Sequence, residues 1–212
     1  LRQLSHLSDK SLKLAFASQS IEADVYWCVT AFVDRLQQNG DYVVEKFGVI
    51  SQRAILSRFE FLCQLADKQL LNDLQTKGID FIFFAFRWMI CLLIRELPIN
   101  VIMRLWDSYF TRPDDVISFH LYTALSFLLT FSEDVQSKEH FEETLLFVQR
   151  IPTDNWTELH AEYLIYCAEQ IEEIDKFYQT FTKEASSQLL VGLVESASLS
   201  MYKDIRIASN KI

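Results

Sequence analysis

Residues 84–107 read FAFRWMICLLIRELPINVIMRLWD, and this stretch constrains the fold more than any other part of the chain. Two arginines, Arg87 and Arg95, lie inside an otherwise apolar run, and Arg104 follows three residues before Asp107. A buried charge costs several kcal/mol unless it is paired and hydrogen-bonded. The stretch is therefore either a structural network of ion pairs or the wall of a binding site, and the residue pattern favours the network.

The helical register of this region predicts a central helix. Residues 79–94 are apolar except for Asp80 and Arg87, and on a helix the polar groups fall on one stripe with Phe84, Cys91 and Arg95. The run is too short for a bilayer span, which needs about 20 residues. We predict one helix from Asp80 to about Glu96 and expect it to be the most buried helix of a soluble core. Arg87 should be at least half-buried and paired with Asp107 or with an acidic residue of segment 22–24.

The composition indicates an all-α protein. The 212 residues are 50% hydrophobic and include only 4 Gly and 3 Pro, whereas sheet proteins need turn residues at every hairpin. Capping residues and apolar periodicity predict helices at eight places. These are residues 22–39, 49–65, 67–76, 80–96, 98–110, 115–131, 137–150 and 157–183.

The charge distribution argues against partners with an anionic surface. The net charge is −9, with 12 basic and 12 acidic residues in 1–107 but 8 basic and 17 acidic residues in 108–212. Nucleic-acid binders and proteins that bind anionic membranes carry basic patches instead. We therefore expect no nucleic acid as a partner and interpret the acidic half as a solvated face.

The residues that usually carry chemistry show no catalytic or metal-binding pattern. The four Cys form no C-x-x-C pair, which favours core residues in a reducing compartment. His140 and Glu143 are three residues apart, and a solvated pair is favoured over a metal site there. There is no G-x-S-x-G, P-loop or G-x-G-x-x-G motif, and no apolar run of a signal peptide at the start. We predict no self-contained active site, no metal site and no cofactor site.

Several separate blocks of the chain share the pattern of a known family. In residues 84–107 the matching positions are Phe86-Arg87-Trp88, Leu92-Leu93, Arg95-Glu96 and Arg104-Leu105-Trp106-Asp107. Outside that stretch they are Ile21-Glu22-Ala23-Asp24 with Trp27 and Cys28, Phe119-His120-Leu121-Tyr122, and Pro152-Thr153 with Asn155-Trp156. This set resembles the TBC domain, the catalytic domain of Rab GTPase-activating proteins, in a subgroup that acts at the Golgi. The likeness covers residues 21–177.

The resemblance implies an irregular multi-helix TBC-type fold and a Rab-family small GTPase as partner. GTP and Mg²⁺ would be bound by that GTPase, so the chain needs no cofactor. Residues 1–183 would be the C-terminal portion of a TBC domain, and residues 184–212 a tail with at most a short helix. The block 84–107 would be scaffold and a candidate Rab groove, formed by Arg87, Trp88, Arg95, Glu96, Arg104, Trp106 and Asp107. The implied setting is vesicle traffic in the cytoplasm, with peripheral attachment at Golgi or endosomal membranes.

The chain departs from the family at its two catalytic motifs. TBC domains stimulate hydrolysis through an Arg finger in I-x-x-D-x-x-R and a Gln finger in Y-x-Q-G, and neither motif occurs in these 212 residues. We expect the chain to correspond to the C-terminal two-thirds of the domain and to be inactive alone, since an arginine finger contributes about 10³–10⁵ in rate. The resemblance implies a role in stimulating GTP hydrolysis by a partner GTPase, so we do not expect the chain itself to be an enzyme.

Two other functions stay open. A non-catalytic helical module could use the same scaffold to hold a Rab or another partner. A helical subunit of a larger assembly, unrelated to GTPases, is the more distant alternative.

Overall fold

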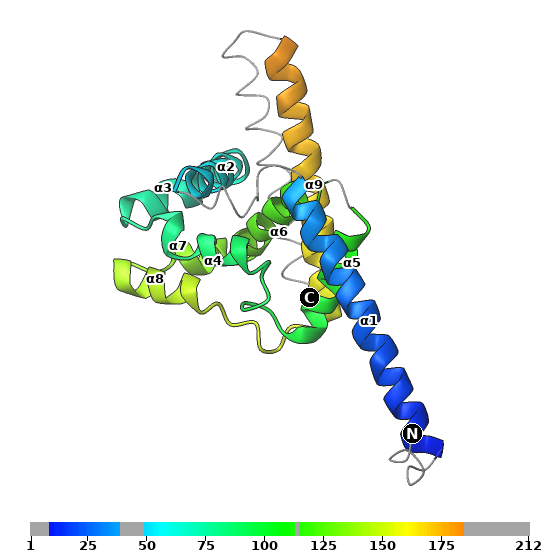
Figure 1. The fold of residues 1–212 in the computed structure, drawn as a ribbon. Coiled ribbons are helices and arrows are strands. Elements are labelled where there is room, and N and C mark those ends of the chain that lie inside the picture. The colour runs from blue at the N-terminus through cyan, green and yellow to red at the C-terminus, as the bar shows by residue number, and fades with distance from the viewer. Residues whose placement is uncertain (1–8, 39–48, 113–114, 185–212) are drawn as a thin grey trace. The chain divides into compact units, whose positions relative to one another are not determined.

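A computed structural model describes residues 9–38, 49–112 and 115–184, and its regular elements in those ranges are all helices (Figure 1). The all-α prediction is therefore confirmed. The chain divides into two units, residues 1–44 and residues 45–212. The first unit contains α1 (Asp9–Gln38), which begins well before the predicted helix 22–39.

The second unit contains the remaining elements. In chain order they are α2 (Val49–Ala66), α3 (Lys68–Thr76), the 3-10 turn η2 (Phe81–Phe83), α4 (Ala85–Ile90), α5 (Ile99–Phe110), α6 (Val116–Thr130), α7 (Ser132–Gln136), α8 (Phe141–Gln149) and α9 (Glu158–Glu184). Helix α7 was not predicted, and α8 begins later than the predicted helix 137–150. The predicted tail 184–212 lies outside the described residues except for Glu184, which ends α9.

Local sequence signals explain where α3 begins and ends. The Asp67 carboxylate accepts a hydrogen bond from the backbone N–H of Leu70 at 2.9 Å, as expected of an N-cap aspartate. Gly78 follows the last turn with a φ of +74°, a left-handed conformation that glycine adopts without steric cost. Asp80 then caps η2 by accepting from the N–H of Ile82 at 3.0 Å.

The prediction of one helix from Asp80 to Glu96 was wrong. The segment is instead divided into η2, α4 and a series of turns over residues 91–97. The cause is local: Leu92 and Leu93 have φ values of +46° and +61°, which no α-helix can contain. Pro98 is the N-cap of α5 and has no N–H to leave unpaired, so the next helix starts directly after the turns.

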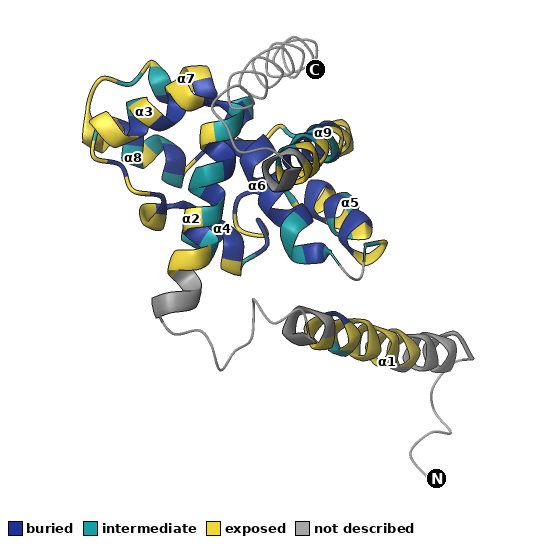
Figure 2. Ribbon diagram, turned by 90° about the horizontal axis from the view of Figure 1, so that it is seen from above, coloured by how far each residue is buried: buried dark blue, intermediate teal, exposed yellow. Residues whose placement is uncertain are grey.

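Helix α6 forms the centre of the second unit and is its most buried helix. Twelve of its fifteen residues are buried, and it packs against α9, α5, α2 and α4 (Figure 2). The prediction that residues 80–96 are the most buried helix was therefore also wrong, although Trp88 in that segment is fully buried as expected. Despite the apolar character of α6, no helix within the described ranges is both long and apolar enough to cross a membrane.

Candidate functional site

Arg87 and Glu96 form the central ion pair of the 84–107 block. Arg87 Nε donates to Glu96 Oε1 at 2.7 Å, and Arg87 Nη2 donates to Glu96 Oε2 at 2.9 Å. Such a two-point pair holds both side chains in a fixed geometry. The Glu96 side chain is 5% exposed and that of Arg87 35% exposed. The expectation that Arg87 is half-buried and paired is confirmed, but the predicted partners, Asp107 and segment 22–24, were wrong.

The break in the predicted helix explains the change of partner. On a continuous helix, residues nine positions apart lie on opposite faces and about 13 Å apart along the axis. The turns over residues 91–97 bring Glu96 back toward α4, where it meets Arg87. Arg87 Nη2 also donates to the backbone carbonyl of Gln149 at 2.9 Å, so the pair connects α4 to the end of α8.

Trp106 reaches the same turns from α5. Its indole Nε1 donates to the backbone carbonyl of Leu92 at 3.2 Å. The hydroxyl of Thr153 donates to the backbone carbonyl of Glu96. The turns are thus held from α5 and from the loop before α9 as well as by Arg87. Sequence reasoning missed both contacts, because neither residue is close to the turns along the chain.

Trp88 and His120 form the buried centre beneath the turns. The Trp88 ring meets Phe84 and Phe127 edge-on, with centroids 4.9 and 5.1 Å away. His120 Nε2 donates to the backbone carbonyl of Trp88 at 3.1 Å, because a carbonyl can only accept, and His120 Nδ1 then accepts from the Tyr109 hydroxyl at 2.9 Å. Burial lowers the pKa of His120 to about 4, so the imidazole is neutral at physiological pH.

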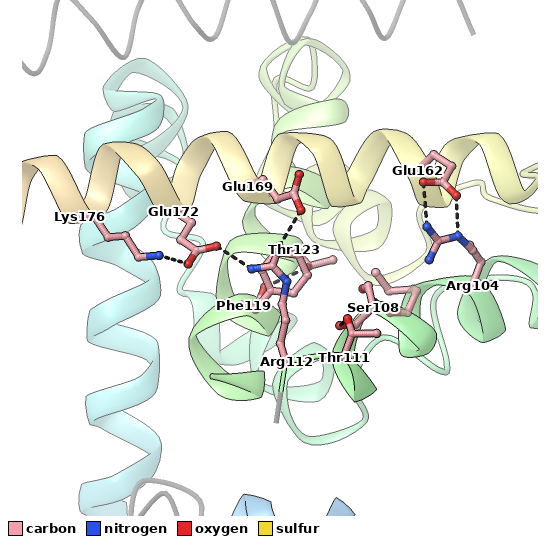
Figure 3. Close-up of polar contacts among 11 residues, drawn as sticks. Arg104, Ser108, Thr111, Arg112, Phe119, Thr123, Glu162, Glu169, Glu172 and Lys176 are labelled. Carbon is pink, nitrogen blue, oxygen red and sulfur yellow. Dashed lines mark hydrogen bonds and ion pairs between the residues drawn. The ribbon is translucent and has the colours of Figure 1, made fainter. Parts of the chain in front are cut away.

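The arginines around α5 pair with α9 rather than within their own helix. Arg104 Nη2 donates to Glu162 Oε2 at 3.0 Å, and not to Asp107 three residues further along the same helix. Arg112, which follows α5, donates to Glu169 at 2.6 Å and to Glu172 at 3.0 Å (Figure 3). These contacts form a row of charge pairs between α9 and the α5 region. Part of the acidic excess of residues 108–212 is therefore paired rather than solvated.

A buried carboxylate on α9 was also missed. Asp175 is fully buried and accepts from the Tyr122 hydroxyl at 2.7 Å, from Gln179 at 2.9 Å and from Arg58 on α2. Burial raises the pKa of Tyr122, so its hydroxyl keeps the proton that it donates. The signal was present in the sequence, since Asp175 follows Ala168 and Ile171 on the apolar face of α9.

The seven predicted groove residues fall into two groups. Five of them build the scaffold: Arg87, Trp88, Glu96, Arg104 and Trp106. Arg95 and Asp107 are exposed, and their side chains make no hydrogen bond or ion pair with any described residue. No cluster of three metal-binding side chains occurs in the described part of the chain. The five scaffold residues thus fix the backbone of the 84–107 block. The charged side chains of Arg95 and Asp107 remain exposed to solvent, where a partner protein could contact them.

Comparison with known families identifies the scaffold. The family model of the Rab-GTPase-TBC domain matches residues 11–136, which is more than half of the chain. The chain belongs to the Rab-GTPase-TBC domain family. The matched range contains α1 from residue 11 onward and every residue of the 84–107 block, so the resemblance stated from the sequence motifs is confirmed.

Named relatives of this TBC chain agree with the family. It is 40% identical over 146 residues to "GTPase-activating protein gyp1" of Schizosaccharomyces pombe, covering 68% of this chain and 27% of that protein. It is 37% identical over 146 residues to human "TBC1 domain family member 22A", covering 69% of this chain and 27% of that protein. The crystal structure of the Ypt/Rab-GAP domain of Gyp1p superposes with a TM-score of 0.64 at 33% identity, covering 72% of this chain and 46% of that one. The chain thus spans about a quarter of the length of these two curated relatives.

Proposed function

We propose that this chain binds a Rab-family GTPase in its GTP-bound state through the TBC scaffold. The observation that carries the proposal is the 84–107 block, which lies inside the family match and is held rigidly by the Arg87–Glu96 pair. GTP and Mg²⁺ enter the complex on the GTPase, and the chain contributes protein contacts only. Nucleic acid is not a partner, in keeping with the net charge of −9.

The chain by itself does not accelerate GTP hydrolysis in this proposal. A GTPase activator supplies chiefly an arginine, and a second side chain that orients water, to a transition state formed on the partner. Neither I-x-x-D-x-x-R nor Y-x-Q-G occurs in the 212 residues. The chain therefore offers scaffold and binding surface without the two groups that act on the nucleotide. The parent protein would activate its GTPase if its full coding sequence supplies both motifs before Leu1.

The TBC portion extends to about residue 183 in this proposal, although the family model ends at residue 136. Helix α9 supports the longer boundary because it packs along α6 and α5, and Leu164, Cys167 and Ala168 on it are fully buried. Removing α9 would expose the apolar centre of the unit. Residues 185–212 would then follow the domain as a tail.

The cellular setting follows from the family resemblance. We place the chain in vesicle traffic on the cytoplasmic side, with peripheral attachment at Golgi or endosomal membranes. Localisation of the tagged parent protein against Golgi and endosomal markers tests this, and a diffuse distribution without either marker would exclude the attachment.

Binding can be measured directly on the 212-residue chain. A panel of purified Rab GTPases, each loaded with either GDP or a non-hydrolysable GTP analogue, is passed over the immobilised chain. The proposal predicts that at least one Rab is retained only when it carries the analogue. Retention of none would reject Rab binding, provided that circular dichroism shows the chain to be helical and cooperatively folded. Equal retention of both nucleotide states would favour the alternative of a general interaction module.

A further inference from the structure

Helix α4 ends in a Schellman-type motif that has leucine where glycine is usual. Cys91 is the C-cap, and Leu92 and Leu93 follow it with φ values of +46° and +61°. The N–H of Leu93 donates to the carbonyl of Trp88, five residues earlier, at 3.2 Å. This bond closes a helix when the residue after the C-cap is left-handed. Because left-handed leucine is strained, the motif persists only where surrounding contacts hold it.

A contact from α6 holds this motif at its acceptor. The side chains of Leu92 and Leu93 are 8% and 0% exposed, but apolar burial is non-directional and does not fix a hydrogen bond. His120 Nε2 donates to the same Trp88 carbonyl at 3.1 Å. A carbonyl oxygen has two lone pairs, so it accepts from both donors. His120 and the left-handed turn therefore meet at one oxygen atom.

A continuous series of hydrogen bonds runs from α5 to the central ion pair. The Tyr109 hydroxyl donates to His120 Nδ1 at 2.9 Å, which keeps the ring proton on Nε2. Beyond the motif, the N–H of Glu96 donates to the carbonyl of Leu93 at 3.0 Å. The Glu96 carboxylate is then held by Arg87 at 2.7 and 2.9 Å. Leu93 thus connects the histidine side of the series to the ion pair.

We propose that His120 is a positioning residue for the 84–107 block. It fixes the Trp88 carbonyl as the acceptor for Leu93, and the turn that results places the two members of the ion pair opposite each other. His120 is fully buried, so it acts through these groups and touches no partner itself. Its effect on Rab binding rests on the proposed function, whereas its effect on the turn does not.

The unchanged chain allows a direct test by NMR. Couplings through hydrogen bonds should connect both the His120 Nε2–H and the Leu93 N–H to the carbonyl carbon of Trp88. The ring proton should lie on Nε2 and exchange slowly with water, because the side chain is fully buried. A ring proton on Nδ1 would overturn the proposal, because Nε2 then has no proton to donate.

Three variants separate positioning from stability. His120→Leu removes the donor to the Trp88 carbonyl, so the Leu93 amide should exchange about tenfold faster relative to the amides of α9, and the Arg87 Nε–H signal should shift. His120→Gln keeps an N–H donor of similar reach, so both signals should stay near those of the unchanged chain although stability falls. The control is Ser126→Ala, because Ser126 lies on the same helix but donates to a backbone carbonyl of α9 at 3.2 Å. It should lower stability and shift neither signal.

Rab binding is measured on the same variants at a temperature where circular dichroism shows each to be folded. The probe is the tightest-binding Rab of the panel, loaded with the non-hydrolysable GTP analogue. His120→Leu should weaken binding about tenfold or more, whereas His120→Gln and Ser126→Ala should stay within about threefold of the unchanged chain.

The measurements distinguish failure of this proposal from failure of Rab binding. If the Leu93 and Arg87 signals of His120→Leu match those of the Ser126→Ala control, the positioning role is refuted whether or not a Rab binds. If both signals change and the Kd does not, the link between the turn and Rab binding is refuted. If no Rab binds the folded chain, the proposed function fails, and the signals of the free chain still decide the role of His120. If His120→Leu does not fold, the couplings and the ring proton of the unchanged chain decide it.

Discussion

Arg87 and Glu96 lie nine residues apart and form a two-point ion pair across a turn that contains two left-handed leucines. The pair depends on the turn, because a continuous helix would place the two side chains on opposite faces. The turn depends on the pair, because a strained backbone persists only when its surroundings hold it. The 84–107 block is therefore a scaffold whose ion pair and backbone support each other.

Breaking the pair should destabilise the fold. Arg87→Ala leaves the carboxylate of Glu96 almost fully buried without its cation and removes the donor to Gln149. We expect a loss of about 3 kcal/mol, the lower end of the range for a buried pair, because about a third of the Arg87 side chain reaches solvent. Urea unfolding followed by circular dichroism measures it.

Arg95→Ala is the control for this prediction, since Arg95 is exposed and should change stability by less than about 0.5 kcal/mol. Glu96→Gln combined with Arg87→Ala should recover part of the loss, because no buried charge is then left alone. An Arg87→Ala midpoint equal to that of Arg95→Ala would contradict the role of the pair.

His120 should make stability depend on pH. Its folded pKa of about 4 is below the unfolded value of 6.5, so the unfolded chain binds the proton first as pH falls. The neutral ring therefore contributes its full share to the free energy of unfolding above about pH 6.5. This share is lost progressively as the pH falls to about 4, and the total loss is about 3 kcal/mol.

A variant isolates this contribution from that of the carboxylates. His120→Gln should lower stability at neutral pH, because the Tyr109 hydroxyl and the Trp88 carbonyl lose their fitted partner. Its stability should fall less between pH 6.5 and 4.5 than that of the unchanged chain. Parallel pH curves for the two proteins would show that His120 is not the titrating group.

Asp175 should contribute more to stability than a neighbouring acid on the same helix. Asp175→Asn removes a buried charge that accepts from Tyr122, Gln179 and Arg58, and we expect a loss of roughly 2 kcal/mol. Glu173→Gln is the control, because Glu173 is exposed on α9. Thermal melting of both variants compares them, and equal melting temperatures would count against the buried cluster.

The sequence predicts the helices whose ends carry chemical signals. Asp67 and Gly78 mark the limits of α3, and the long apolar run of residues 115–131 corresponds closely to α6. The family resemblance was also drawn from separate motif blocks such as 84–107 and 119–122, and both lie within the range that the family model matches. These features are local in the chain, so they can be read without knowing the packing.

The features that could not be predicted depend on contacts between distant segments. The residue types at positions 92 and 93 do not indicate a positive φ, because a left-handed conformation is usually signalled by glycine or asparagine and both residues are leucine. Arg104 pairs with Glu162, which is 58 residues away in the sequence. The two side chains meet because α5 packs against α9. The partner of Arg87 was predicted wrongly for the same reason. A continuous helix over residues 80–96 would place Glu96 on the opposite face from Arg87, so Glu96 was not expected as its partner.

We propose that this TBC chain holds a Rab GTPase without supplying the groups that act on GTP. Single-turnover hydrolysis by a Rab that binds the chain tests it most directly, with the chain in excess and shown to be folded by circular dichroism. We predict a rate equal to the intrinsic rate of that Rab, and acceleration when a TBC protein that carries both the I-x-x-D-x-x-R and the Y-x-Q-G motif is used instead. Acceleration of about 10³ or more by the 212-residue chain alone, the scale of an arginine finger, would show that an arginine within residues 1–212 acts on the nucleotide.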